Sequence, residues 1–198
     1  MRLVELRNQM DVGYWLEVST GATPVQGFMG AQKTVRQAEL TDKQLDALRT
    51  TLLSHFEFTA VTQALSIPRA FISVAHPSAQ YSAHVDWEQQ SGVDVDLSFT
   101  VPLQLPVRGG ELVFFTGEHL PQTIGAATVY PTHYVHEVLP VLAGTRIAIV
   151  GWVESKYKTS EARACAEALD RVTRATKRGS PEWLHACQAK ALLARAVR

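Results

Sequence analysis

The hydrophobic positions near the start of the chain follow a helical spacing. A polar segment at 41–44 contains a threonine followed by an aspartate, which is a common helix N-terminus. Leucines then recur every turn, so that one side of a helix becomes apolar. These leucines are Leu45, Leu48, Leu52 and Leu53. Residues 42–55 are therefore predicted to form an amphipathic helix.

Between about residues 69 and 154 the spacing changes to that of β-strands. Short β-branched or aromatic runs are separated by turns rich in proline and glycine, such as 106–110, and this pattern is typical of strands and hairpins. The predicted strands are 70–75, 94–101, 111–115, 127–130 and 145–154. Many short strands without intervening helices predict a mainly β fold, either an antiparallel sandwich or a jelly roll (double-stranded β-helix).

A helical pattern returns at about 159–198. Ser160 is a candidate cap for an alanine-rich helix, and Ser180-Pro181-Glu182 has the residues of a second helix start. No linker-like segment divides the chain. We therefore expect one domain, 1–198, with a jelly-roll core at about 69–154. The N-terminal helix is expected to pack on this core, and a helical pair is expected at the C-terminal side.

The composition is that of a globular protein. The 198 residues are 46% hydrophobic and only 19% charged, unlike a disordered chain. The longest apolar run, 147–153, is too short to cross a bilayer. Glu5 lies near the start and no long apolar segment follows it, which argues against a secretory signal. A cytoplasmic protein without membrane association is the expectation.

Charge is unevenly distributed although the formal net charge is zero. Residues 1–155 contain 9 Lys/Arg and 15 Asp/Glu, whereas 156–198 contain 10 and 4. No aromatic-rich or groove-reading motif accompanies the basic part, so we interpret it as a solvated helical face and expect no nucleic-acid partner. Cys165 and Cys187 are expected to be free thiols, with a disulfide across a helical hairpin as the alternative.

His84 and Asp86 are the first candidates for a metal site. Residues two apart in a strand project from the same face, so the segment 80–86 directs an imidazole and a carboxylate toward one point. A third ligand from a distant strand would complete a 2-His-1-carboxylate set, which leaves coordination positions open. The His-x-Asp spacing is common by chance and needs support from other residues.

That support comes from a second cluster about fifty residues later. His133 and His136 compete as the third ligand, and His136 stands at the start of a strand pattern. Arg146 follows on a strand whose same face is otherwise apolar. A buried arginine is costly unless it meets an anion, and its planar fork suits a carboxylate. A dicarboxylate that chelates the metal and is held by Arg146 accounts for all these residues.

Several short motifs follow one another along the chain. They are Tyr81-x-x-His84-x-Asp86, Asp96-Leu97-Ser98-x-Thr100, Gly109-Gly110-Glu111-Leu112, Tyr130-Pro131 followed by His136-x-Val138, and Gly144-Thr145-Arg146 with Trp152. In this order they resemble the prolyl 4-hydroxylase-type Fe(II)/2-oxoglutarate oxygenases, and most of all the bacterial PKHD-type hydroxylases. The resemblance covers about 80–155, with a weaker similarity at 30–37.

The resemblance implies that His84, Asp86 and His136 bind Fe(II) and that Arg146 binds the distal carboxylate of 2-oxoglutarate. His136 is preferred to His133 because it keeps the family spacing to Arg146. The implied cofactors are Fe(II), 2-oxoglutarate and O2, with ascorbate as an additional candidate. The implied reaction is hydroxylation of an unactivated C–H bond, coupled to decarboxylation of 2-oxoglutarate to succinate.

The resemblance defines the substrate side less closely. Tyr81 matches a tyrosine that commonly lies near the co-substrate, and an aromatic that only fills the barrel is the alternative. Trp87 is a candidate for the substrate mouth, with ordinary packing as the alternative. A prolyl residue of a peptide or protein, or a related free amino acid, is the expected substrate. Segments 15–40 and 155–198 are expected to frame the entrance.

Two other functions would use the same residues. A zinc hydrolase with a metal-bound water leaves Arg146 without a role and finds no obvious general base in the sequence. A non-catalytic jelly-roll module that binds metal or 2-oxoglutarate as a sensor is the second alternative, and the complete ligand set argues against it.

Overall fold

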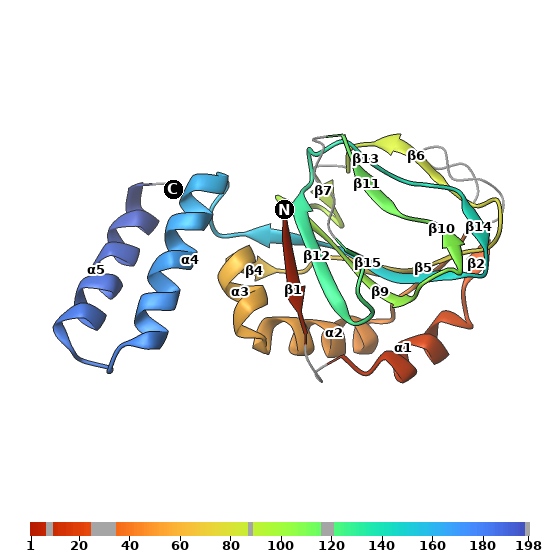
Figure 1. Ribbon diagram of the computed structural model, residues 1–198. Helices are drawn as coiled ribbons and strands as arrows, with labels where there is room; N and C mark the ends of the chain where they lie inside the picture. The colour runs from red at the N-terminus through yellow and green to blue at the C-terminus, as the bar shows by residue number, and fades with distance from the viewer. Residues whose placement is uncertain (7–9, 25–34, 87–88, 116–120, 197–198) are drawn as a thin grey trace.

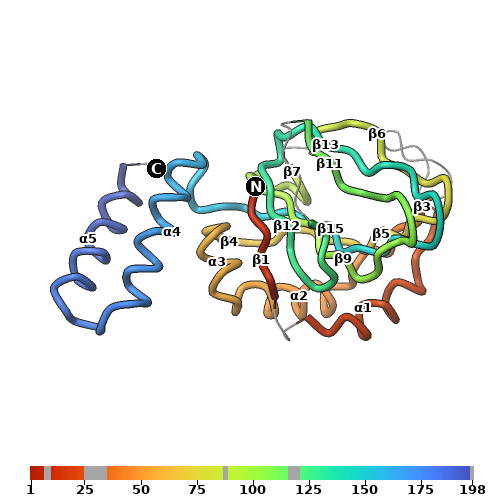
Figure 2. The backbone as a smooth tube through the Cα atoms, in the orientation of Figure 1, coloured from red at the N-terminus to blue at the C-terminus, as the bar shows by residue number. Residues whose placement is uncertain are grey.

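Two antiparallel β-sheets face each other at the centre of the molecule (Figure 1). The computed structural model describes residues 1–6, 10–24, 35–86, 89–115 and 121–196. Helices cover the outer face of the larger sheet, and a helical hairpin extends to one side, as the backbone trace also shows (Figure 2). All strand pairs in the described part of the chain are antiparallel.

The larger sheet contains eight strands within the described residues. Seven run in the order β1-β12-β9-β15-β5-β3-β2, and β4 pairs with β15 beside them. Their bounds are β1 Arg2–Glu5, β2 Thr23–Pro24, β3 Val35–Glu39, β4 Ala64–Ser66, β5 Ala70–Ala75, β9 Leu97–Gln104, β12 Ala126–Pro131 and β15 Arg146–Ser155. The long β15 pairs with both β9 and β5, so it fixes the centre of this sheet.

Side chains of the larger sheet alternate between two environments, because successive residues of a strand point to opposite faces. One face packs against the helices α1 Val12–Ser19, α2 Asp42–Ser54 and α3 Phe56–Thr62 and is apolar. Its buried members include Ala38, Ile72, Val74, Leu97, Phe99, Val101, Val129, Ile147, Ile149 and Val153. The opposite face looks toward the second sheet and carries polar side chains among apolar ones.

Helix α2 illustrates how the sequence builds the helix-covered side. The side chain of Thr41 accepts a hydrogen bond from the backbone N–H of Gln44, and the Gln44 side chain accepts one from the Thr41 backbone. This capping box fixes the start of the helix. Leu48 and Leu52 are fully buried against the sheet. The predicted helix is confirmed, and it ends at Ser54.

The second sheet is smaller and lies opposite the larger one (Figure 1). Its three strands run in the order β11-β13-β6, and two further pairs, β10-β14 and β7-β8, extend the same half of the molecule. Their bounds are β6 Tyr81–His84, β7 Gln89–Gln90, β8 Val93–Asp94, β10 Arg108–Gly109, β11 Leu112–Phe114, β13 His136–Val138 and β14 Val141–Ala143. Gly109 has φ +76°, and a Cβ there would lie 2.2 Å from the carbonyl oxygen of Pro140, so the turn requires glycine.

The C-terminal helices α4 Ser160–Ala175 and α5 Pro181–Ala196 form a hairpin beside the sheets (Figure 1). Thr159, not Ser160, caps α4: its side chain accepts from the backbone N–H of Ala162, which places the predicted cap one residue too late. Cys165 and Cys187 are free, as expected. No helix in the described ranges is long and apolar enough to span a bilayer.

The strand predictions differ in accuracy. The strand 70–75 is exact, and those at 111–115, 127–130 and 145–154 match β11, β12 and β15 within two residues. The strand predicted at 94–101 is divided: Asp94 belongs to β8, which pairs with β7, and β9 begins at Leu97 and continues to Gln104. Strands β1 and β3 and helices α1 and α3 were not predicted.

Candidate metal centre

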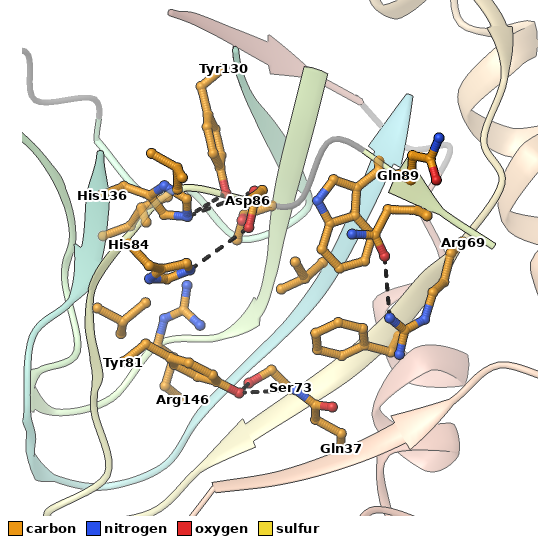
Figure 3. A pocket seen from close by; sticks show the side chains of 18 of the residues that line it. Gln37, Arg69, Ser73, Tyr81, His84, Asp86, Gln89, Tyr130, His136 and Arg146 are labelled. Atoms are coloured by element: carbon orange, nitrogen blue, oxygen red, sulfur yellow. Dashed lines mark hydrogen bonds and ion pairs between the residues drawn. The ribbon is translucent and has the colours of Figure 1, made fainter. Parts of the chain in front are cut away.

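Strand pairing brings the three candidate ligands together. In the second sheet His84 of β6 lies directly opposite His136 of β13. Asp86 follows β6, and its backbone N–H donates to the carbonyl of Thr132 at 3.0 Å. Nε2 of His84 lies 3.8 Å from Oδ1 of Asp86, and Nε2 of His136 lies 3.9 Å from Oδ2. The ligand atoms all lie within 4.8 Å of one another, and Figure 3 shows the three side chains converging.

Backbone carbonyls orient both imidazoles. Nδ1 of His84 lies 2.7 Å from the carbonyl oxygen of Ser82, and Nδ1 of His136 lies 2.9 Å from that of Tyr134. A carbonyl only accepts, so each Nδ1 carries the proton and each Nε2 presents a lone pair toward Asp86. This arrangement is typical of histidines that bind a metal through Nε2. Burial lowers the pKa of His136, which keeps its imidazole neutral at pH 7.

Asp86 is held from the side of the larger sheet. The hydroxyl of Ser98 on β9 donates a short hydrogen bond to Oδ2 of Asp86. The Asp86 side chain is only 10% exposed. No described lysine or arginine pairs with this buried carboxylate, whose neighbours are two imidazoles and a hydroxyl. A metal cation between the three ligands would supply it.

Arg146 opens β15 and points into the same cavity (Figure 3). It is 2% exposed, and its Nε has no hydrogen-bond partner among the residues that the structure describes. No ion pair joins it to a described carboxylate, and the titratable groups that act on it are the phenols of Tyr81 and Tyr130. Burial lowers the pKa of Arg146, yet a guanidinium keeps its charge at neutral pH.

Tyr81 lies beside Arg146, with its hydroxyl held by the larger sheet (Figure 3). The hydroxyl lies 3.1 Å from Oγ of Ser73, and Nε2 of Gln37 donates to it at 3.3 Å. Tyr81 also packs against the small cluster formed around Leu112 and Val138. Its ring therefore fills space, as the alternative interpretation expects, while its hydroxyl lies at the cavity wall.

These residues surround one cavity of about 540 Å³ between the two sheets, a size typical of small-molecule sites. Phe71, Val150 and Trp152 form part of its apolar wall, and Gln89, Gln90 and Ser91 are among its polar lining residues. Gln37 is the one described residue of the segment 15–40 that lines the cavity. No described residue after Trp152 lines the cavity, so its lining gives no support to the expectation that 155–198 frames the entrance. Trp87 lies outside the described residues.

The structure places His133 away from this centre. His133 is exposed and packs edge-on against Tyr134, with ring centroids 5.3 Å apart. Among the described residues His84, Asp86 and His136 are the single group of three that satisfies metal-ligand geometry. The two competing histidines are therefore separated by strand geometry, because His136 starts β13 whereas His133 lies in the preceding turn.

Sequence reasoning assigned no role to several residues in or directly behind the cavity wall. Ser98, Thr100 and Tyr130 come from β9 and β12, and Ser73 and Gln37 come from β5 and β3. A signal was present in β9, where Ser98 and Thr100 alternate with Leu97, Phe99 and Val101. Polar residues at every second position of a fully buried strand mark the side that faces a polar site.

Comparison with known proteins identifies the family. Residues 70–154 match the 2OG-Fe(II) oxygenase superfamily. A PKHD-type hydroxylase of Maricaulis maris is 31% identical over 175 residues, which cover 86% of this chain and 80% of that protein. The chain belongs to the 2OG-Fe(II) oxygenase superfamily, in its PKHD-type branch. A PKHD-type hydroxylase of Idiomarina loihiensis is 33% identical over 175 residues, 79% of each chain. The resemblance noted in the sequence is thereby confirmed.

The fold agrees with the family. A viral collagen prolyl hydroxylase from Paramecium bursaria Chlorella virus-1, solved with 2OG, superposes with a TM-score of 0.59 at 13% identity. The match covers 78% of this chain and 95% of that chain. At this identity the match concerns the fold alone, and it confirms the predicted mainly β, jelly-roll core with flanking helices. As a 2OG-Fe(II) oxygenase, the protein is an enzyme that uses Fe(II), 2-oxoglutarate and O2.

The donor set fits this chemistry. Adjacent ligand atoms that bind one ion at about 2.1 Å lie about 3 Å apart, so small side-chain movements would bring the atoms around Asp86, now 3.8 and 3.9 Å apart, onto one ion. Two imidazoles and one carboxylate are the donors of the iron facial triad. The buried, unpaired guanidinium of Arg146 fits the carboxylate of a dicarboxylic co-substrate.

Proposed function

We propose that this PKHD-type oxygenase holds Fe(II) with His84, Asp86 and His136 and the distal carboxylate of 2-oxoglutarate with Arg146. When bound, iron and 2-oxoglutarate supply the O2 chemistry that oxidises an unactivated C–H bond, with succinate as the co-product. The observation that carries this proposal is the charged, fully buried side chain of Arg146, which has no described counterion in the cavity that contains the three ligands.

The energetics of Arg146 explain why the co-substrate is an anion. A buried guanidinium without a counterion destabilises the folded chain, and a carboxylate removes this cost through two parallel charge-assisted hydrogen bonds. The only described carboxylate in the cavity lining is Asp86, which is already part of the metal set. We infer that the anion for Arg146 comes from the ligand, and a short dicarboxylate could also reach the metal centre with its other end.

Tyr81 is proposed to position the same co-substrate. Ser73 and Gln37 hold its hydroxyl at the wall beside Arg146. This leaves the phenol in one orientation before the ligand enters, which limits the entropy lost on binding. Tyr81 would therefore help Arg146 to select the bound orientation of 2-oxoglutarate.

The remaining part of the cavity is proposed to receive a residue of a peptide or protein. Phe71, Val150 and Trp152 offer an apolar wall suited to a prolyl or similar ring. A free amino acid would also need an anion for its ammonium group, and the described lining has no carboxylate besides Asp86. The carboxylate of a free amino acid would need a cation, and Arg69, which lines the cavity, is already paired with Glu39. The viral neighbour is named a collagen prolyl hydroxylase, which agrees with this substrate class.

Three earlier expectations remain proposals. We propose that 1–198 act as one oxygenase domain, since strands from both its N-terminal and its C-terminal parts join the larger sheet. Trp87 is kept as a candidate for the substrate mouth because it follows Asp86 directly. Ascorbate is kept as an optional reductant on the family resemblance.

A spectroscopic titration tests the proposal and separates it from a sensor. The anaerobic protein loaded with Fe(II) should develop a visible charge-transfer band on addition of 2-oxoglutarate, and admission of O2 should convert 2-oxoglutarate to succinate. A sensor would show the band and form no succinate. A zinc hydrolase would show neither, and it would also lack a general base among the described lining residues.

A further inference from the structure

The hydroxyl of Tyr130 lies in an environment that its ring does not require. Tyr130 belongs to β12 and is 2% exposed. Its ring packs in an apolar cluster with Leu112, Phe114 and Val138, edge-on to Phe114 with centroids 4.9 Å apart. A phenylalanine would make these ring contacts equally well. The buried hydroxyl therefore needs a separate explanation, because a polar group in such a position is costly unless it forms hydrogen bonds.

The hydroxyl reaches the metal ligands. Its oxygen lies 3.4 Å from Nε2 of His136, and Figure 3 shows it directed at the space between His136 and Asp86. A phenol O–H is both a donor and an acceptor, so the Tyr130 hydroxyl can donate to these ligands. The side chain of Thr100 forms a further hydrogen bond with the Tyr130 hydroxyl. With Thr100 as the donor in that bond, the proton of Tyr130 is directed to the metal ligands.

The acceptor of this proton must change when a metal binds. Nδ1 of His136 carries the imidazole proton because it faces the carbonyl of Tyr134, so the lone pair is on Nε2. Without metal, Nε2 can accept from Tyr130. A metal on Nε2 occupies that lone pair, and the Asp86 carboxylate, whose charge acts on Tyr130, is then an acceptor for this proton. Ser98 already donates to Oδ2 of this carboxylate, which has about four acceptor positions and can accept a second donor.

We propose that Tyr130 is a positioning residue of the metal centre, whose hydroxyl, held by Thr100, donates to Nε2 of His136 in the metal-free protein and to the carboxylate of Asp86 once metal is bound. The assignment rests on the proposed function, since it takes His136 and Asp86 as ligands. In this arrangement Ser98 and Tyr130 hold the carboxylate from the larger sheet while the second sheet supplies the imidazoles. Tyr130 thus links the two sheets at the ligands.

Cobalt(II) binding to the purified chain tests this assignment without any turnover. Tyr130→Phe keeps the ring and removes only the hydroxyl. Loss of a hydrogen bond behind a ligand typically weakens metal binding, and we expect about 10-fold weaker Co(II) binding by calorimetric titration. The visible d–d bands of the bound Co(II) should also shift, because the Asp86 carboxylate loses a hydrogen bond and its donor strength toward the metal changes. A role confined to packing would change neither quantity.

Two further variants make the test specific. Tyr157→Phe is the matched control, since Tyr157 is equally buried, its hydroxyl has no hydrogen-bond partner, and it does not line the cavity. It should bind Co(II) like the wild type. Thr100→Val should weaken Co(II) binding in the wild-type background and have no further effect beside Tyr130→Phe, because Thr100 acts through the Tyr130 hydroxyl. This variant also keeps the test valid if Tyr130→Phe folds poorly.

The outcomes separate this assignment from the proposed function. A wild-type chain that fails to bind Co(II) would overturn both. Tight Co(II) binding by the wild type, with the same affinity and the same d–d bands in Tyr130→Phe, would overturn the Tyr130 assignment alone. Equal effects of Thr100→Val in both backgrounds would also contradict it, since Thr100 would then act independently of Tyr130.

Discussion

The two faces of the larger sheet are equally buried but chemically different. Toward the helices, β5, β9 and β15 present Ile72, Phe99 and Ile149, all without solvent exposure. The alternate residues of these strands face the cavity, and they include Ser73 and Arg146, whose side chains are also buried. Burial therefore does not distinguish the structural face from the functional one. What distinguishes them is whether the buried groups need a partner that the folded chain itself does not provide.

This difference has an energetic meaning. The helix-covered face gains its stability from apolar area removed from water, which the chain achieves alone. The cavity face contains an unpaired guanidinium, and the second sheet across the cavity adds a carboxylate and two imidazoles that are grouped as a metal site would need. Substitutions on the first face should therefore change folding stability, and substitutions on the second should change ligand binding.

The largest effect is expected at the metal ligands. His136→Ala removes one of the three proposed ligands and should weaken Co(II) or Fe(II) binding by more than about 100-fold. Loss of a group that only hydrogen-bonds to a ligand typically has a smaller effect. The folding stability of the metal-free protein should change much less. Calorimetric metal titration and chemical denaturation measure the two quantities separately.

His133→Ala is the matched control, because His133 is an exposed histidine only three residues away. It should bind metal within about two-fold of the wild type. Loss of binding in this variant together with retained binding in His136→Ala would show that the ligand assignment is wrong.

The next effect belongs to the helix-covered face. Phe99 is fully buried and packs edge-on against Phe58, with centroids 5.7 Å apart. Phe99→Ala should lower the free energy of unfolding by about 3–5 kcal/mol, as expected for a large cavity in a core. Metal affinity of the protein that remains folded should be unchanged. A loss of metal affinity as large as that of His136→Ala would remove the distinction between the two faces.

Arg146 should show opposite effects on binding and on stability. Arg146→Met removes an unpaired buried charge but keeps an apolar side chain of similar length, so the ligand-free protein should gain about 1 kcal/mol, or about 2–4 °C in Tm. The metal-loaded variant should lose measurable 2-oxoglutarate binding. Arg146→Lys keeps the charge but not the fork, and it should bind 2-oxoglutarate weakly. A lower Tm together with normal 2-oxoglutarate binding in Arg146→Met would contradict this interpretation.

The smallest effect is expected at Tyr81. Tyr81→Phe keeps the ring in its cluster and removes a hydroxyl that Ser73 and Gln37 hold at the wall. One neutral hydrogen bond is worth about 1 kcal/mol, so 2-oxoglutarate affinity of the metal-loaded protein should fall about 5-fold. Unchanged affinity would assign Tyr81 to packing alone, which is the alternative interpretation of its ring.

The sequence predicts the central strands and the residues of the metal centre because local patterns encode them. The period of two around His84 and Asp86, and the position of Arg146 on an apolar strand, are visible without a structure. The choice between His133 and His136 came from family spacing, and the pairing of His136 with His84 explains it physically.

Other features depend on partners distant in the sequence. β1 pairs with β12, which lies far from it in the sequence. The short segment Arg2–Glu5 has no strand pattern of its own. The role of the Tyr130 hydroxyl depends on β12 lying beside β9, which places Thr100 within reach. The C-terminal helices lie beside the sheets and do not line the cavity, and no local pattern in 155–198 indicates this.

The most direct test is a crystal structure of the protein grown anaerobically with Fe(II) and 2-oxoglutarate, with data collected at the iron absorption edge. The anomalous signal should show one iron bonded to Nε2 of His84, Nε2 of His136 and the carboxylate of Asp86, and the distal carboxylate of 2-oxoglutarate should contact Arg146. Iron at another position, or 2-oxoglutarate bound away from Arg146, would contradict the central claim.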